Sequence, residues 1–366
     1  MNPYATKLAE AFAATIILVY FENTITPMIT NGDYEGEVKD KATVCNIPTV
    51  GGATLKNYTG ADLTADDVTE SAGQLLTNQA KAYYFKVKDF ARLESFIKQP
   101  EGSLLDQLVG LLNQTIDAYV LGLYTKAGAG NRDGTDYVTG TVAVAATTGV
   151  VTGSSTTFTS AMVGRGFKAA GHTKWYRVLS YSSTTSITIG NDVDDVTAFY
   201  DGGAISGGAT YTIEAVTGIA VTKSNIYAHI LNLDTKLNQR FAPKNNRWLA
   251  LNSAIAALLR QAPEFIPSGV PAAYEDVVKN GFVVKIAGFD VYQNEQVAGD
   301  AVNGYRILAG HKSAITFGMA LTESEVEAQI IGNFGKAYKG LNVYGAKVVD
   351  ERRKVLAEGF WIPTAS

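Results

Sequence analysis

The sequence has little of what metalloenzymes and secreted proteins use. Its 366 residues include three histidines and a single cysteine, Cys45. One cysteine cannot close a disulfide within the chain, so nothing links the protein to an oxidising compartment. Only 18% of the residues are charged, and the formal net charge is −4. This balance excludes the strongly basic class of nucleic-acid binders, which use Lys and Arg to displace counterions from phosphates.

Long hydrophobic runs are also missing. The most apolar run covers residues 16–21, whereas a membrane-spanning helix needs about 20 apolar residues. The flanks of this run lack the basic segment and the small-residue cleavage site of a secretory signal. We therefore expect an unprocessed chain that is made in the cytoplasm and has no membrane partner.

What is present is enough apolar material for a folded core. The hydrophobic share is 46%, which excludes intrinsic disorder. A length of 366 residues corresponds to about two to three domains.

The residues that carry most metal and nucleophile chemistry are scattered. His172, His229 and His311 belong to no H-E-x-x-H or CxxC pattern, so a structural or surface role is favoured over metal ligation for each. Cys45 lies in a strand-like run, which favours a packed thiol over a nucleophile.

The acidic residues show no arrangement typical of a catalytic or calcium site. Residues 192–195 could offer oxygen ligands, but they lack the glycine and distal glutamate of an EF-hand loop, which favours a solvated turn. Glu101, Asp106 and Asp117 are too widely spaced for general acid–base chemistry and are interpreted as a solvated helix edge.

Glycine-rich segments do not match phosphate-binding loops either. Residues 128–130 and 202–208 lack the P-loop pattern and the strand–GxGxxG–helix context, so they are interpreted as a linker and a turn. The sequence predicts no catalytic site, no metal site and no cofactor, and we do not expect an enzyme.

The hydrophobic pattern predicts a mixed α and β chain. Residues 4–20 have helical spacing, and 101–126 form the strongest predicted helix, with Pro100 at its start. Residues 41–50 and 83–90 alternate as strands do, and they flank a long excursion with a polar tip.

Residues 136–216 differ in composition from the rest of the chain. Of these 81 residues, 23 are Ser or Thr, 11 are Gly and none is Pro. Short β-rich runs alternate with turn signals, which predicts a small inserted all-β sandwich or barrel. The predicted strands are 141–145, 149–151, 156–158, 175–179, 185–189 and 210–213.

Helices and strands alternate again after this segment. A helix is predicted from an N-cap at Ser224, with its apolar face at Ile226, Ile230, Leu233 and Leu237. The other predicted helices are 254–260 and 274–279, and the predicted strands are 247–251, 305–308, 314–317, 341–349 and 355–362. Residues 282–286 and 289–292 are predicted to form a hairpin.

The order of these elements and several local sequences resemble the major capsid proteins of tailed double-stranded-DNA bacteriophages. Those proteins share the Hong Kong phage capsid fold, also called the Johnson fold. The segments that carry the resemblance are 44–50, 80–90, 226–237, 243–248, 286–292 and 340–349.

The resemblance implies an α+β fold with an N-terminal arm, an extended E-loop, a spine helix, and peripheral and axial domains. The implied divisions are 1–32 for the arm, 33–88 for the E-loop region, 89–135 for the peripheral domain with its spine helix, 136–216 for the inserted β domain, 217–338 for the axial domain and 339–366 for the strands that return to the peripheral domain.

The implied function is structural. Such a chain self-assembles into hexamers and pentamers of an icosahedral shell around the viral DNA, in the virion capsid, after assembly in the host cytoplasm. The implied partners are copies of itself, separate scaffolding, portal and decoration proteins, and packaged DNA held only non-specifically. Either a separate scaffold or none is expected because the arm-like helix begins almost at Met1. The alternatives are an encapsulin-like bacterial compartment shell and a virion surface or tail adhesin.

Charged residues in the extended segments and basic clusters are the candidates for contacts between subunits. Exposed charges at a strand end would also explain the basic group at residues 352–354. The predicted assembly contacts are Glu35, Lys39, Lys41, Asp62, Lys244, Arg247, Arg352 and Arg353.

Overall fold

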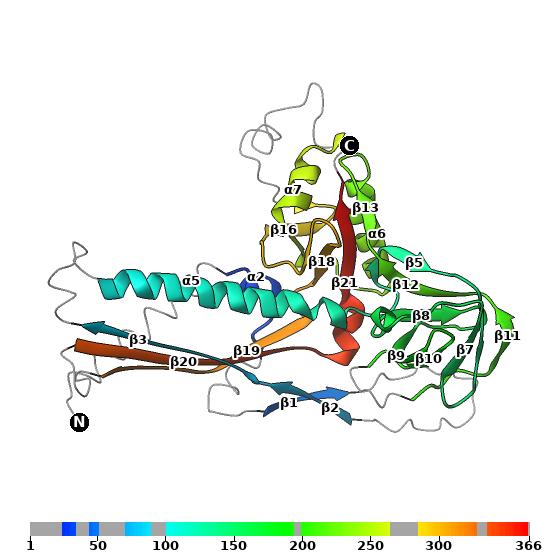
Figure 1. Ribbon diagram of the computed structural model, residues 1–366, viewed down its shortest axis with the longest axis horizontal. Coiled ribbons are helices and arrows are strands. Elements are labelled where there is room, and N and C mark those ends of the chain that lie inside the picture. Colours follow the sequence, from blue (N-terminus) through cyan, green and yellow to red (C-terminus); the bar gives the residue numbers. More distant parts are fainter. Residues whose placement is uncertain are drawn as a thin grey trace, which may run out of the picture. The chain divides into compact units, whose positions relative to one another are not determined.

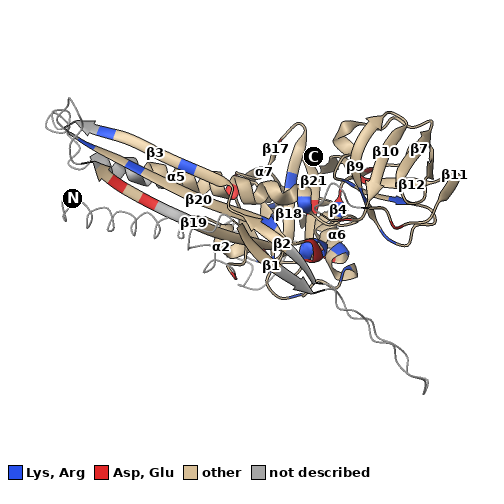
Figure 2. Cartoon of the chain, turned by 90° about the horizontal axis from the view of Figure 1, so that it is seen from below, with Lys and Arg blue, Asp and Glu red and all other residues tan. Residues whose placement is uncertain are grey.

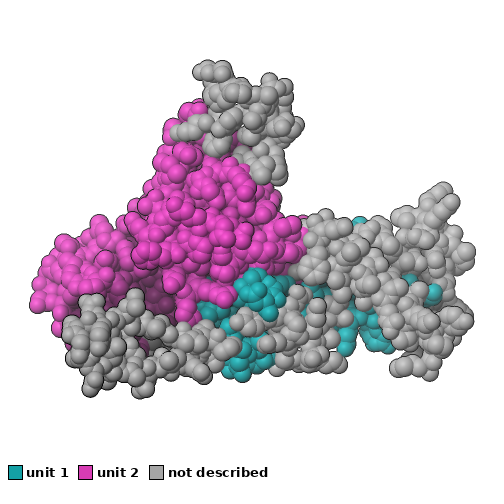
Figure 3. All heavy atoms as spheres, turned by 180° about the vertical axis from the view of Figure 1, so that it is seen from behind, with its two compact units in different colours: residues 1–23, 31–112, 316–349 teal, residues 24–30, 113–315, 350–366 magenta. Residues whose placement is uncertain are grey.

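The computed structural model describes residues 24–33, 44–50, 70–88, 100–193, 199–263, 285–327 and 335–364. The predicted helices 4–20 and 274–279 and the polar tip of the excursion lie outside these residues. The chain divides into two compact units, coloured separately in Figure 3. The first consists of Met1–Asn23, Asn31–Leu112 and Thr316–Val349, and the second of Thr24–Thr30, Asn113–Ile315 and Asp350–Ser366.

The first unit contains two small antiparallel sheets. β1 (Val44–Val50) pairs with β2 (Glu70–Leu76), and the order of the second sheet is β19 (Ile315–Glu327), β20 (Gly335–Val348), β3 (Gln79–Lys88). The two predicted strands are thus present as β1 and β3. The prediction that they form the two sides of the excursion is wrong, because the chain returns along β2. β2 was missed because its Gly73 and Ser71 break the alternating pattern.

The long sheet of this unit has one apolar face, as the alternation predicts. The rings of Tyr83 and Phe85 stack at 6.3 Å, and Phe85 stacks on Tyr338 of β20 at 5.1 Å. Tyr84 and Lys86, on the opposite face of β3, are exposed. The strands run side by side over most of their length in Figure 1.

The predicted long helix is α5 (Pro100–Leu121), and Pro100 is its first residue. It continues as a 3-10 turn, η1 (Gly122–Lys126). Ile116 and Val120 are fully buried, one turn apart.

One of the two eight-stranded sheets described for the second unit is built from residues 135–217. Its strand order is β11-β6-β7-β10-β9-β8-β12-β5. In chain order the strands are β5 (Thr135–Tyr137), β6 (Thr141–Val144), β7 (Val150–Ser154), β8 (Gly166–Ala169), β9 (Tyr176–Ser183), β10 (Ser186–Gly190), β11 (Ile205–Ala209) and β12 (Tyr211–Thr217). A short 3-10 turn, η2 (Ser160–Met162), precedes β8.

This sheet has a hydrophobic core of its own, which includes Val151, Phe158, Phe167 and Ile213. Five of the six strands predicted in the segment are present. Residues 156–158 do not form a strand, and β5, β8 and β11 were not predicted. That the segment forms a separate inserted domain stays a prediction.

The other sheet of the second unit has the order β13-β21-β18-β14-β16-β15, with β4 paired to β21 and β17 paired to β18. The strands are β4 (Arg132–Asp133), β13 (Ile219–Val221), β14 (Arg247–Leu251), β15 (Lys285–Ile286), β16 (Phe289–Gln293), β17 (Gly299–Asp300), β18 (Gly304–His311) and β21 (Leu356–Pro363). The predicted hairpin is present as β15 and β16. Ala287 and Gly288 form its turn at φ 48° and 84°, as a tight hairpin requires.

Besides the end of α5, the described residues of the second unit include the helices α2 (Thr26–Ile29), α6 (Ile226–Gln239) and α7 (Ser253–Arg260). The four residues predicted for the apolar face of α6 are all fully buried, and α6 packs beside β21 and β4 (Figure 1). The predicted cap at Ser224 is wrong, since the N-cap is Asn225. Asn252 caps α7 by accepting a hydrogen bond from the Ile255 N–H at 3.1 Å.

Candidate functional site

The structure describes half of the residues predicted for assembly. Glu35, Lys39, Lys41 and Asp62 lie outside the described residues. Lys244 is exposed between α6 and β14. Arg352 is half-buried in the 3-10 turn η5 (Asp350–Val355), where it donates a hydrogen bond to the Ser313 carbonyl at 3.2 Å.

Arg247 is buried inside its own chain, with 1% of its surface exposed. Its guanidinium donates to Asp234 Oδ1 at 2.5 Å and to Asn238 Oδ1 at 2.9 Å, both on α6. It also donates to the carbonyls of Ala242 and Pro243, at 2.6 and 2.7 Å. Arg247 therefore holds the α6–β14 turn against the helix that precedes it.

Arg353 is also buried, and the interpretation of its basic cluster as exposed strand-end charges is wrong for this residue. Its Nη2 lies 3.0 Å from Asp192 Oδ1. Asp192 in turn accepts a hydrogen bond from the Ala129 N–H at 2.6 Å. Asp192 therefore binds groups of its own chain, and its interpretation as part of a solvated turn is wrong. The partners are far apart in the sequence, so local pattern gave no sign of them.

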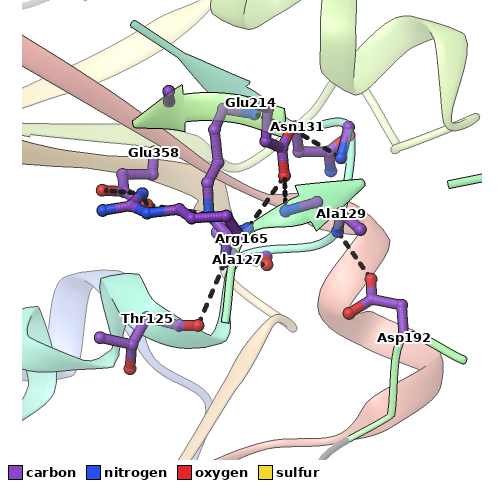
Figure 4. A network of polar contacts seen from close by, with 12 residues as sticks. Thr125, Ala127, Ala129, Asn131, Arg165, Asp192, Glu214 and Glu358 are labelled. Carbon is purple, nitrogen blue, oxygen red and sulfur yellow. Dashed lines mark hydrogen bonds and ion pairs between the residues drawn. The ribbon is translucent and has the colours of Figure 1, made fainter. Parts of the chain in front are cut away.

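The most extensive polar arrangement is a buried charge network of two glutamates and three arginines (Figure 4). Its carboxylates belong to Glu214 of β12 and Glu358 of β21, whose side chains are 2% and 0% exposed. Its cations are Arg132 of β4, Arg165 just before β8, and Arg306 of β18. The network thus joins the sheet built from 135–217 to the sheet that contains β21.

Glu358 is the centre of this network. Its oxygens lie 2.9 Å from nitrogens of each of the three arginines, Arg132, Arg165 and Arg306. Breaking such a buried pair leaves a charge without compensation and costs several kcal/mol. A single side chain therefore ties three strands and the segment before β8 to one another.

Glu214 is held by backbone as well as by charge. It accepts from the N–H groups of Gly130 at 2.8 Å and Gly166 at 3.0 Å, and it pairs with Arg132 at 2.9 Å. Burial alone would lower the pKa of Arg132, but Glu214 and Glu358 outweigh it and raise that pKa. The carboxylates face N–H donors in a closed interior, an arrangement suited to holding strands rather than to transferring protons.

Asp117 is buried too, so its interpretation as part of a solvated helix edge is wrong. It accepts hydrogen bonds from the hydroxyls of Thr24 and Thr26 and, at 2.7 Å, from the Asn294 side chain. Thr26 begins α2, and Asn294 follows β16. Asp117 therefore fastens the short segment 24–30 and the end of a strand to α5.

The histidines have structural contacts, as expected. His229 Nδ1 lies 2.9 Å from Asp133, and His311 Nδ1 lies 2.7 Å from the hydroxyl of Ser313. Within the described parts of the chain, no group of three His, Cys, Asp or Glu side chains could hold a metal ion. Cys45 is buried beside Ile47 and Leu75, as predicted for a packed thiol.

The contacts of His172 assign its tautomer. Nδ1 accepts from the Ala169 N–H at 3.2 Å, so Nε2 carries the proton and donates to the Tyr200 hydroxyl at 2.7 Å. That hydroxyl donates onward to the Gly203 carbonyl at 2.8 Å. Burial, and then the charge of Lys168, lower the pKa of His172, which favours this neutral form.

On the exposed face of the long sheet in the first unit, one outer strand carries acidic side chains and the other carries basic side chains. Figure 2 shows acidic residues on β19 and basic residues on β3. Glu323 and Glu325 are exposed on β19, and Lys86 is exposed on β3. Lys339 of the middle strand pairs with Glu325 at 2.8 Å.

Comparison with known proteins gives a match in structure only. No protein-family model matches the chain, and no curated protein matches its sequence. A structure from Mycobacterium phage Che8 aligns with a TM-score of 0.60 and 16% identity, covering 92% of this chain and 91% of that one. The capsid of Cyanophage P-SCSP1u aligns at 0.51 and 13% identity, over 92% and 86% of the two chains.

The mature capsid of bacteriophage PhiM1 also aligns, at a TM-score of 0.51 and 11% identity, over 90% of this chain and 87% of that one. The chain has the fold of phage capsid proteins. The sequence resemblance predicts this fold for nearly all of the chain outside residues 136–216, and the alignment extends over 92% of the chain. No helix among its described residues has the length and apolarity to cross a membrane.

Proposed function

We propose that the chain is the major capsid protein of a tailed double-stranded-DNA bacteriophage. It self-assembles into hexamers and pentamers that close an icosahedral shell around the genome. The observation that carries this proposal is the shared fold with phage capsid structures over about nine tenths of both chains.

Within this proposal, the extended elements bind neighbouring subunits. Residues 1–32 are the N-terminal arm and 33–88 include the E-loop, with β1 and β2 as its base. α5 is the spine helix of the peripheral domain, 217–338 form the axial domain, and 136–216 form an inserted domain on the outer surface. Cys45, Ile47 and Leu75 of this base pack with Val349 of the same chain, so its apolar side chains are already buried within the subunit.

The proposed partners follow from the same role. Copies of the chain form the shell, and separate scaffolding, portal and decoration proteins complete the particle in the host cytoplasm. The net charge of −4 suits a shell lining that does not hold DNA tightly. Isolated capsomers should bind DNA poorly at physiological salt, and submicromolar, salt-steep binding in a mobility-shift assay would contradict this.

Electron microscopy of the full chain, expressed alone and with a cognate scaffold, tests the proposal. Closed icosahedral shells are expected, and a stable monomer under both conditions would overturn it. The contents of particles purified from their natural source discriminate the alternative shell. Packaged DNA supports a virus, whereas enclosed enzymes would indicate an encapsulin-like compartment.

A further inference from the structure

Phe241 is the most exposed large hydrophobic residue that the structure describes, at 94%. It stands two residues beyond the end of α6, and its backbone φ is +57°. Glycine or asparagine usually occupies this left-handed position after a helix, because a Cβ there costs about 1 kcal/mol. A phenylalanine at this place is unfavourable for the isolated chain in both backbone conformation and solvent exposure.

The turn around Phe241 is nevertheless firmly held. The backbone N–H of Phe241 donates to the Asn238 carbonyl at 3.0 Å, and that of Ala242 donates to the Leu237 carbonyl at 3.1 Å. Arg247 binds the carbonyls on the other side of the turn, at Ala242 and Pro243. The aromatic ring therefore projects from a rigid support, so little conformational entropy is lost when it binds.

The surroundings of Phe241 favour a protein partner. After the buried Ala242, the chain continues with four exposed residues, Pro243, Lys244, Asn245 and Asn246. A rigid aromatic anchor within a polar rim is the usual composition of a binding hot spot between proteins. Duplex DNA accepts a phenylalanine ring only where a base step is unstacked, which costs a few kcal/mol.

We propose that Phe241 is an anchor of the contact between two copies of this chain, and that its ring inserts into an apolar pocket of the neighbouring subunit. This inference rests on the proposed function, in which the partner of every subunit is another copy. The exposed Lys244 beside it suits a partner that carries net negative charge, as this chain does.

The test replaces Phe241 with residues that tolerate the left-handed conformation, Phe241→Gly and Phe241→Asn. Both remove the ring and relieve the backbone, so the unfolding midpoint of unassembled subunits should stay the same or rise. Assembly should need about tenfold more protein or worse, the loss expected for a hot-spot side chain. Sedimentation velocity and electron microscopy measure this on the full chain.

Asn246→Gly is the matched control. Asn246 lies in the same turn at φ +51° and is exposed, so this variant changes the backbone freedom of the turn and keeps the aromatic ring. It should assemble like the unaltered chain. An equal assembly defect in Asn246→Gly would show that turn rigidity, not the ring, matters, and would overturn the inference.

The remaining outcomes separate this inference from the proposed function. If the unaltered chain forms shells and both Phe241 variants form them equally well, only the inference fails. If the variants lose stability as monomers, Phe241 has a role within its own chain and the inference fails. If DNA binding falls while assembly is unchanged, the partner is not a second copy. If the unaltered chain never assembles, the proposed function fails together with the inference.

Discussion

The backbone N–H of Gly166 donates a hydrogen bond to Oε1 of Glu214 at 3.0 Å, and a Cβ at Gly166 would lie only 2.3 Å from the same oxygen. The glutamate can approach the backbone this closely because residue 166 has no side chain. Gly130 donates to the other oxygen of the carboxylate. Gly166 thus makes room for the buried charge, whereas a Cβ at Gly130 would meet the side chains of Arg240 and Trp175.

Gly166→Ala should therefore lower the free energy of unfolding by about 3–5 kcal/mol, the cost of disrupting a buried ion pair. The added methyl group must displace the Glu214 carboxylate and weaken its contact with Arg132. Urea unfolding measures the loss. Gly203→Ala is the control, since a Cβ there meets nothing within 4 Å. Equal free energies of unfolding for the two variants would contradict the role of Gly166 in making room for the Glu214 carboxylate.

Glu358→Gln should lower the free energy of unfolding at least as much as Gly166→Ala does. The amide has nearly the same shape but no charge, so Arg165 and Arg306 would lose the carboxylate that they share. We expect a loss of about 3–5 kcal/mol in the free energy of unfolding. Glu351→Gln, at an exposed residue of η5, should change stability by less than about 0.5 kcal/mol. Thermal unfolding of both variants at low and high salt checks this, because a buried pair is screened little by salt.

Asp117→Asn tests the attachment of α2 to α5. The amide offers one acceptor oxygen where the carboxylate offers two, and its NH2 group would face either Thr26 or Asn294, which donate to different oxygens of Asp117. Leaving buried donors without an acceptor costs about 1–3 kcal/mol. Gln114→Ala, at an exposed position of the same helix, should be nearly neutral. If Asp117→Asn unfolds at the same midpoint as the unaltered chain, these hydrogen bonds add nothing to its stability.

Acidification should destabilise the chain through His172. Its pKa is lowered in the folded state, first by burial and then by Lys168. The folded state therefore binds fewer protons, so the stability present above a pH of about 6.5 declines as the pH falls below that value. His172→Gln should reduce the drop in unfolding midpoint between neutral and mildly acidic pH. The same drop in the variant and the parent would assign the effect to other groups, such as His311, whose pKa burial also lowers.

The regular elements could be predicted from local pattern. The buried face of α6, the bounds of β14 and the turn at Ala287 and Gly288 all follow from periodicity and turn chemistry. β2 and β8 could not be found in this way, because short strands with glycine or lysine acquire their burial from distant partners.

The partners of the buried polar groups could not be predicted from local pattern either, although the sequence does indicate that two of these groups are buried. Asp117 lies at helical spacing with Asn113, Ile116 and Val120, all of which are buried, so its position on the inner face was visible. Glu358 is a lone charge within an otherwise apolar strand. Their partners could not be named, because Asn294 is 177 residues from Asp117 and no local rule connects them.

Deletion of residues 136–216 separates a shell protein from an adhesin. Thr135 and Thr217 are paired across β5 and β12, so a short linker can join them without moving the rest of the chain. The deletion removes Glu214, Arg165 and Asp192. Glu358 keeps Arg132 and Arg306, and Arg353 keeps Asp350 at 3.9 Å. Arg132 also keeps its hydrogen bonds to the carbonyls of Thr125 and Ala127.

The shortened chain should therefore unfold cooperatively and still form shells in electron micrographs, with less mass on their outer surface. A glycan-binding adhesin would instead lose its ligand while its assembly state stayed the same. A shortened chain that folds but remains monomeric would show that the β segment itself supplies contacts between subunits. Its placement on the outer surface would then be wrong, since only a segment between neighbouring subunits can be needed for closure.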